Sequence, residues 1–99
     1  MAFERCLPQV FSFDSIRRNA PAVSGVYGIS NPRHWLYVGE TDNIQASLFA
    51  HVTGGGIATE DLAPSGYRYE ECSVDERRRR QQRLISELAP VCQQQMTPR

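Results

Sequence analysis

Residues 24–43 read SGVYGISNPRHWLYVGETDN. It contains two tripeptides that each join a tyrosine, a valine and a glycine, Gly25-Val26-Tyr27 and Tyr37-Val38-Gly39. They lie a hairpin's length apart, and asparagine and proline, which favour turns, stand between them. The alternation of side chains predicts two strands, Val23 to Ser30 and Trp35 to Thr41, that pair as an antiparallel hairpin.

The same alternation predicts which side chains share a face of each strand. On the first strand, Tyr27 and Ile29 point away from Val26. On the second strand, one face carries Trp35, Tyr37 and Gly39, and the other carries Leu36 and Val38. Gly25 and Gly39 are expected where another part of the chain approaches the backbone closely, or at a bulge or strand end.

Two further helices and one more strand follow the hairpin. Asp42 or Asn43 is expected to cap a helix that runs to about Val52. Tyr67 to Ser73 reads as a third strand, with Tyr67 and Tyr69 on the face opposite Cys72. Ser73 or Asp75 then caps a helix from Asp75 to about Leu88, and Ala89-Pro90 ends it.

Before the hairpin, Asp14 to Arg18 reads as one short helical turn with Asp14 as its cap. Phe11 and Phe13 are expected to pack down as an N-terminal strand or arm. The sequence therefore predicts an α+β fold, with a small three-stranded antiparallel sheet flanked by helices. We expect a single domain over residues 1–99, with a core from about 19 to 93 between an irregular N-terminal arm and C-terminal tail.

The composition limits the class of protein. A length of 99 residues suggests one domain, and a hydrophobic content of 40% suffices for a globular core. No apolar run approaches the roughly 20 residues that span a bilayer, and the first residues lack the apolar block of a signal peptide. We therefore expect a cytoplasmic protein without a membrane partner. The cysteines Cys6, Cys72 and Cys92 form no Cys-x-x-Cys pair, which favours free thiols over a zinc site.

The net charge is zero, but the charges are unevenly placed. Residues 77–99 carry six arginines and one acid, and the chain has no lysine. Four candidates for contact with nucleic-acid phosphates lie on the last helix: Arg77, Arg78, Arg80 and Arg83. The alternative is a solvated helix face, partly neutralised by acids on the same helix or by Glu70 and Glu71 of the third strand.

The ordered motifs resemble the GIY-YIG nuclease domain. Gly25-Val26-Tyr27 and Tyr37-Val38-Gly39 are similar to its two name-giving tripeptides, and Asn43-Ile44 is similar to the start of its first helix. Leu84-Ile85, followed by Pro90, is similar to its closing segment. The resemblance implies hydrolysis of a phosphodiester with one divalent metal, Mg²⁺ or Mn²⁺. It also implies that Tyr27 and Tyr37 help to activate water.

The resemblance further implies an arginine on the first helix, a metal-binding glutamate on the last, and in some members a histidine. His51 stands at the histidine position, but Ser47 replaces the arginine and Gln81 replaces the glutamate. Gln93 stands where many members have asparagine. An amide cannot supply the charge of a carboxylate to a hard cation, and the loss of one charge-stabilising donor costs about 100- to 1000-fold in rate.

These departures predict a degenerate GIY-YIG-like domain that lacks nuclease activity and acts as a nucleic-acid-binding or interaction module. Its partner would be DNA or RNA, or a protein, and it would need no metal or small-molecule cofactor. An active metal-dependent DNA endonuclease is the first alternative, and a protein-interaction or purely structural domain is the second. Gln81 is expected to point at the sheet and to join Tyr27 or Ser47 in a polar, metal-free network.

Overall fold

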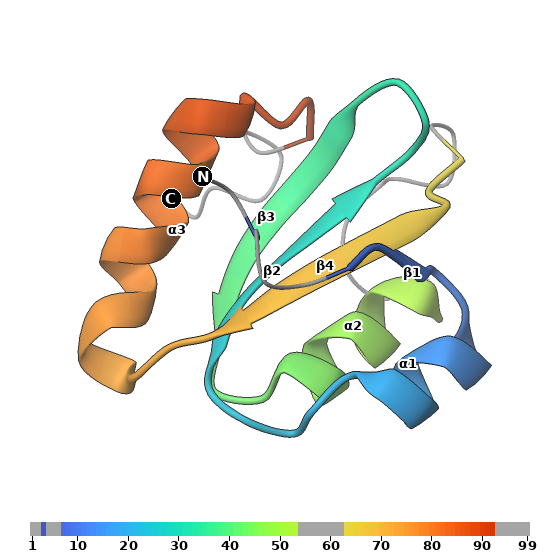
Figure 1. Cartoon of the computed structure of the whole chain (residues 1–99), viewed down its shortest axis with the longest axis horizontal. Coiled ribbons are helices and arrows are strands. Elements are labelled where there is room, and N and C mark those ends of the chain that lie inside the picture. The colour runs from blue at the N-terminus through green and yellow to red at the C-terminus, as the bar shows by residue number, and fades with distance from the viewer. Residues whose placement is uncertain (1–2, 4–6, 54–62, 93–99) are drawn as a thin grey trace.

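The computed structural model describes residue 3 and residues 7–53 and 63–92 (Figure 1). The chain is α+β, and the described residues form a four-stranded antiparallel sheet and three helices. In chain order the elements are β1 (Gln9–Val10), α1 (Phe13–Asn19), β2 (Gly25–Ser30), β3 (Trp35–Thr41), α2 (Ile44–Val52), β4 (Gly66–Glu71) and α3 (Val74–Leu88). None of the helices in these ranges is long and apolar enough to cross a membrane.

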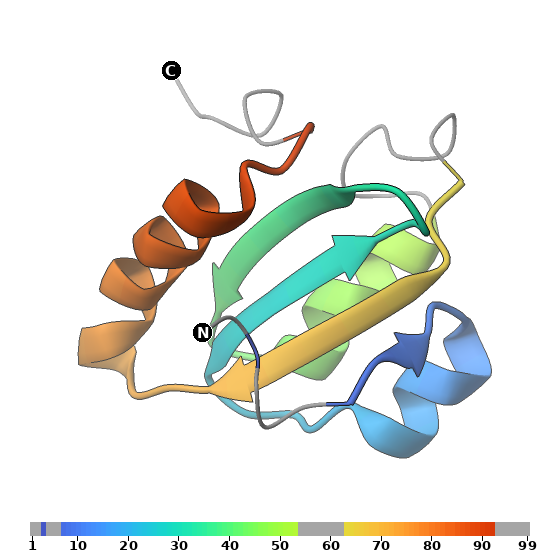
Figure 2. The same cartoon turned by 45° about the horizontal axis from the view of Figure 1, so that its top comes forward.

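The predicted hairpin is confirmed, since β2 and β3 pair antiparallel with Tyr27 opposite Gly39. The strands lie in the order β1-β4-β2-β3, so β2 is central and also pairs with β4 (Figure 2). The prediction of three strands is wrong, because the two residues of β1 pair with β4 through Gln9 opposite Tyr67. An N-terminal strand or arm was expected at Phe11 and Phe13, but the strand lies at Gln9–Val10 and Phe13 begins α1. Two residues are too short to show an alternating pattern that would place the strand.

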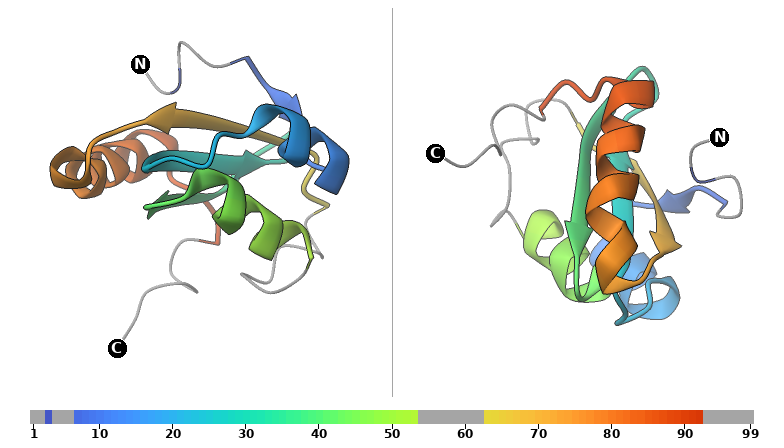
Figure 3. Two further views of the ribbon diagram at one scale, coloured as in Figure 1. Left: turned by 90° about the horizontal axis from the view of Figure 1, so that it is seen from below. Right: turned by 90° about the vertical axis from the view of Figure 1, so that its left-hand side faces the viewer.

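The helices cover the two faces of the sheet. One core cluster joins Ile16 of α1 and Leu48 of α2 to Tyr27 of β2. The other cluster joins Leu84 of α3 to Val26 of β2. Because neighbouring residues of a strand point to opposite faces, α3 packs on the face away from α1 and α2. Figure 3 shows α2 and α3 approaching the sheet from different sides, and α1 lies beside α2.

A bulge interrupts the alternation predicted for β3. Ile29 pairs with Tyr37 but Ser30 pairs with Trp35, so Leu36 is the extra residue. Leu36 and Tyr37 therefore pack in the same cluster, while Trp35 packs with the cluster of α3. The prediction that Trp35 shares a face with Tyr37 is wrong for this reason. The predicted faces of β2 and β4 are confirmed, since Tyr67 and Tyr69 join the cluster opposite Cys72.

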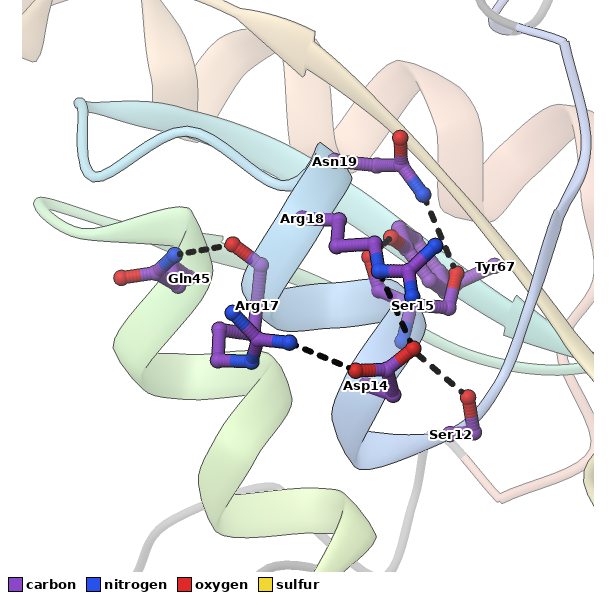
Figure 4. A network of polar contacts seen from close by, with 8 residues as sticks. All are labelled: Ser12, Asp14, Ser15, Arg17, Arg18, Asn19, Gln45 and Tyr67. Atoms are coloured by element: carbon purple, nitrogen blue, oxygen red, sulfur yellow. Dashed lines mark hydrogen bonds and ion pairs between the residues drawn. The ribbon is translucent and has the colours of Figure 1, made fainter.

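The helix caps explain where the helices begin. Asn43 caps α2 as predicted, with its side chain accepting a hydrogen bond from the Ala46 amide. For α1 the predicted cap is wrong, since Ser12 accepts the bond from the Ser15 amide. Asp14 lies inside the first turn, between the guanidinium groups of Arg17 and Arg18 (Figure 4). This position suits an acid, because the N-terminal end of a helix dipole is positive.

Side-chain bonds hold α1 against its neighbours (Figure 4). The Gln45 amide of α2 donates to the carbonyl oxygens of Arg17 and Ala20. The Tyr67 hydroxyl of β4 donates to the Ser15 carbonyl. These bonds connect α1 to both α2 and the sheet.

The last described helix begins after Ser73 and ends at Ala89, whose φ of 48° places it in the left-handed region before Pro90. Of the three cysteines, Cys72 is half-buried and Cys92 is buried, and both are free thiols as predicted. Cys6 and Gln93 lie outside the described residues, as do the outer parts of the predicted arm and tail.

Candidate functional site

Three residues that the sequence singled out meet on the face of the sheet that α2 covers. Tyr27 comes from β2, Tyr37 from β3 and His51 from the last turn of α2. The Tyr27 hydroxyl and His51 Nε2 are 2.8 Å apart, within hydrogen-bond distance. The His51 ring centroid lies 5.6 Å from that of Tyr27 and 5.4 Å from that of Tyr37. We call these three residues the aromatic cluster.

The aromatic cluster is closed to solvent. Tyr27 is 4% exposed, and Tyr37 and His51 are each 8% exposed. Burial lowers the pKa of His51 to about 4, because a charged imidazolium would lose its hydration. Burial also raises the pKa of both tyrosines, and the charge of Glu40 adds to that rise. At neutral pH all three side chains are therefore uncharged.

The two ring nitrogens of His51 have different surroundings. Nε2 faces the Tyr27 hydroxyl, but Nδ1 is buried and finds no hydrogen-bond partner among the described residues. Because the raised pKa of Tyr27 keeps its hydroxyl protonated, we assign the proton to Tyr27 and let it donate to Nε2. The neutral imidazole then carries its own proton on Nδ1.

Ser47, which the resemblance places where an arginine is expected, lies beside this cluster. Its hydroxyl donates to Thr41 Oγ1 over 2.7 Å. Ser47 also acts to lower the pKa of Tyr27, although burial outweighs this effect. Thr41 was missed in the sequence; its hydroxyl also accepts from the Asn43 amide, so it couples the end of β3 to the start of α2. A threonine two residues before a helix cap is the signal that points to it.

The glycines of the two tripeptides have a packing role. A Cβ on Gly39 would lie 2.5 Å from the ring and hydroxyl of Tyr27, the residue opposite it. A Cβ on Gly25 would lie 2.3 Å from the Glu70 carbonyl oxygen of β4. Neither distance is compatible with an ordinary contact. The expected close approach is therefore present at both glycines, and at Gly39 the approaching group is the tyrosine itself.

Gln81 lies on the other side of the sheet. It points at the sheet as predicted, but its amide donates to the Val38 carbonyl of β3 over 3.2 Å. The predicted partners, Tyr27 and Ser47, are wrong, because both lie on the side of the sheet covered by α2. The segment after α3 donates to the same strand, from the Val91 amide to Trp35 and from the Cys92 amide to Leu36. Gln81 thus belongs to a set of donors along β3.

The residues at this site do not fit a divalent cation. Such an ion prefers anionic oxygen ligands, and Gln81 offers a neutral amide already bound to a carbonyl. Among the described residues, Glu40 is the carboxylate whose charge raises the pKa of both Tyr27 and Tyr37. Its Oε1 lies 2.7 Å from Arg77 Nε in an ion pair. A cation here would have to displace the Arg77 guanidinium.

The four candidate arginines of α3 divide into two pairs. Arg77 binds Glu40 and also donates to the Ser24 hydroxyl. Arg80 forms two bonds of 3.0 Å to the two carboxylate oxygens of Glu70. Arg78 and Arg83 are exposed, as is Arg79. The solvated, partly neutralised face considered in the sequence thus describes Arg77 and Arg80, although Glu40 was not foreseen as a partner.

No family model matches the chain, and comparisons with curated proteins and with solved structures find no match either. The resemblance to the GIY-YIG nuclease domain therefore remains a prediction from the motifs and the order of the elements.

Proposed function

We propose that this chain is a GIY-YIG-like domain that binds nucleic acid and does not hydrolyse it. The observation that carries the proposal is the closed state of the aromatic cluster. Tyr27, Tyr37 and His51 contact one another, stay uncharged at neutral pH and expose 8% of their surface or less. A group that activates water must reach that water and accept its proton near the working pH. Buried neutral side chains serve as a packed core instead.

The lack of hydrolysis is supported by what surrounds the cluster. A phosphodiester transition state gathers negative charge, which fixed cations or a metal must stabilise. Ser47 bonds to Thr41 where the family has an arginine. Glu40, the described carboxylate whose charge raises the pKa of both tyrosines, is neutralised by Arg77. Within residues 7–53 and 63–92, the site therefore lacks both the cationic group and the free anionic ligand that the reaction needs.

Nucleic-acid binding is supported by the exposed charges of α3. No acidic side chain of the described residues pairs with Arg78, Arg79 or Arg83, in contrast to the ion pairs of Arg77 and Arg80. Guanidinium groups bind phosphate oxygens in a bidentate manner. Because the whole chain has zero net charge, contact with a polyanion has to be local rather than driven by the overall field.

The test combines a cleavage assay and a binding assay. The purified protein is incubated with plasmid, single-stranded and branched DNA in the presence of Mg²⁺ or Mn²⁺. We expect no cleavage above background, together with binding that weakens as salt rises, because phosphate contacts release counterions. Replacing Arg78 and Arg79 by glutamine should weaken that binding.

Cleavage that Tyr37→Phe abolishes would overturn the proposal in favour of the nuclease. A lack of binding to every DNA and RNA substrate would overturn it in favour of a protein-interaction or structural domain. Cleavage that Tyr37→Phe leaves unchanged indicates a contaminating nuclease, and the remaining binding data then decide.

A further inference from the structure

A hollow of about 220 Å³ lies at the end of the sheet where β2 turns into β3. The turn itself supplies Arg33 and His34, the start of β3 supplies Trp35, and β4 supplies Arg68. Arg68 is opposite Gly28, so it points to the same face of the sheet as Val26 and α3. Arg33, His34 and Trp35 are consecutive, whereas Arg68 comes from a distant part of the sequence, and none of the four belongs to the site described above.

The hollow is positively charged. No acidic side chain is among the described residues that line it, and no ion pair within residues 7–53 and 63–92 engages Arg33 or Arg68. The nearest acid on the same strand face is Glu70, two residues along β4, and Arg80 already binds it through both carboxylate oxygens. The guanidinium groups of Arg33 and Arg68 are therefore available to an anion.

The walls of the hollow are held in place. Asn31 Oδ1 accepts hydrogen bonds from the amides of Arg33 and His34 over 2.8 and 2.7 Å. The Asn31 amide donates to the His34 carbonyl, which closes the turn. The Trp35 ring packs over Gly28, where a Cβ would lie 2.6 Å from the indole, and stacks on Phe3. A site whose parts are fixed beforehand loses less entropy when a ligand binds.

We propose that this hollow binds one phosphate of a nucleic-acid strand, with Arg33 and Arg68 as its ligands and Trp35 as an apolar wall beside the sugar or base. Arginine and an adjacent aromatic ring form the combination that binds single strands. The volume is below the roughly 300–1,000 Å³ of pockets that enclose drug-sized ligands, which favours one group of a longer ligand over a free cofactor. The inference rests on the proposed function and locates one of its contacts.

The chain offers a direct reporter, because Trp35 is its one tryptophan. Binding of an oligothymidine is followed by fluorescence anisotropy of a labelled strand and, separately, by the intrinsic fluorescence of Trp35. We expect both signals to change in parallel with strand concentration. The double variant Arg33→Gln/Arg68→Gln should lose the Trp35 response and about tenfold or more in affinity, which is the range of a charge-assisted hydrogen bond. For this variant, the slope of log binding constant against log salt concentration should be smaller in magnitude by about 0.7, the value for one phosphate of a single strand.

The matched control is Arg78→Gln/Arg79→Gln, which removes the same charge from the exposed face of α3. It should keep the full Trp35 response at saturation even where its affinity falls. Arg33→Lys/Arg68→Lys preserves the charge and should keep part of the affinity. Circular dichroism of each variant shows whether it is folded.

The outcomes separate this inference from the proposed function. If the strand binds by anisotropy while Trp35 fluorescence stays constant, the hollow is not the contact and the proposed function survives. If inorganic phosphate changes Trp35 fluorescence and the strand does not, the hollow is a site for free phosphate and the inference is overturned. If no strand binds at all, both fail together.

Discussion

The two faces of the sheet carry polar groups in opposite ways. On the face covered by α2, the aromatic cluster is uncharged and almost fully buried. On the face covered by α3, charged side chains pair between the helix and the sheet, Arg77 with Glu40 and Arg80 with Glu70. Both faces carry residues that the sequence singled out as functional. On each face, the contacts within the protein account for most of those residues.

This contrast between the two faces indicates which arginines are available to a ligand. Charges that are half-exposed and paired cost little to keep but are not available to a ligand. Buried neutral groups are not available either. Among the described residues, the arginines that remain for a polyanion are the exposed ones of α3 and those of the hollow at the β2–β3 turn.

The strongest test of the packed face is Gly39→Ala. The new methyl group would meet the Tyr27 ring at 2.5 Å, so the cluster must shift, and we expect a loss of about 3 kcal/mol in the free energy of unfolding. Chemical denaturation measures it. The matched control is Gly66→Ala in β4, where a Cβ would meet its nearest atom at 3.4 Å. Equal losses at both glycines would mean that strand propensity, and not the tyrosine, sets the cost.

The second test is the pH dependence of stability. The pKa of His51 is about 4 in the folded chain against 6.5 for the free side chain, so between these values the unfolded chain binds more protons. Stability should therefore fall as the pH drops from about 6.5 to 4, by on the order of 2 kcal/mol from this group. Denaturation at several pH values measures it.

The control for this effect is the chain's other histidine. His51→Gln should flatten the pH dependence in that window, whereas His34→Gln, at an exposed turn position, should leave it unchanged. A wild-type profile that is flat from pH 6.5 to 4 would show that His51 is not buried as described.

The third test separates a structural glutamine from a lost metal ligand. Gln81→Glu removes the amide that donates to the Val38 carbonyl and places a carboxylate beside it. We expect a loss of about 1–2 kcal/mol, because a carbonyl loses its donor and faces a like partial charge. The neighbouring exposed residue gives a matched control, and Gln82→Glu should cost little.

Divalent metal distinguishes the two interpretations of Gln81 further. If Gln81→Glu restored a metal site, Mg²⁺ would raise the melting temperature of that variant and not of Gln82→Glu. We expect no difference between them. A metal-dependent gain at Gln81 alone would favour the nuclease alternative.

The smallest expected effect concerns the charged face. Arg77→Gln leaves Glu40 without its partner, and we expect a loss of about 1 kcal/mol that shrinks as salt rises. Arg78→Gln, one residue along the helix and exposed, should change stability by less than about 0.5 kcal/mol. Thermal melting at low and high salt measures both. If Arg78→Gln proved the more damaging, the assignment of structural and free arginines would be reversed.

Local patterns in the sequence predicted the local structure well. The hairpin, the Asn43 cap, the extent of α3 and the faces of β4 all followed from alternation and from capping residues. Through the resemblance, the sequence also predicted Tyr27, Tyr37 and His51 as residues of one site. The structure places them in contact. Their role in a reaction stays a prediction.

What the sequence missed depends on contacts between distant segments. The two residues of β1 form a strand only because β4 is beside them. The bulge at Leu36 appears only once the register of β2 against β3 is known. The partners of Gln81 and Arg77 depend on which face of the sheet α3 covers. The periodicity of side chains within one segment does not predict that face. The hollow at the β2–β3 turn forms only when three separate segments meet: Pro8, residues 30–35 and Arg68.

The fit between Tyr27 and Gly39 has a consequence for how such chains change over time. The two residues belong to different tripeptides but occupy one volume, since the ring lies where a Cβ on Gly39 would be. A larger residue at one position is tolerated only with a smaller one at the other. In a set of related chains the two positions should therefore vary together whether or not any of them cuts DNA. The pair records a steric constraint on the hairpin that does not depend on any reaction.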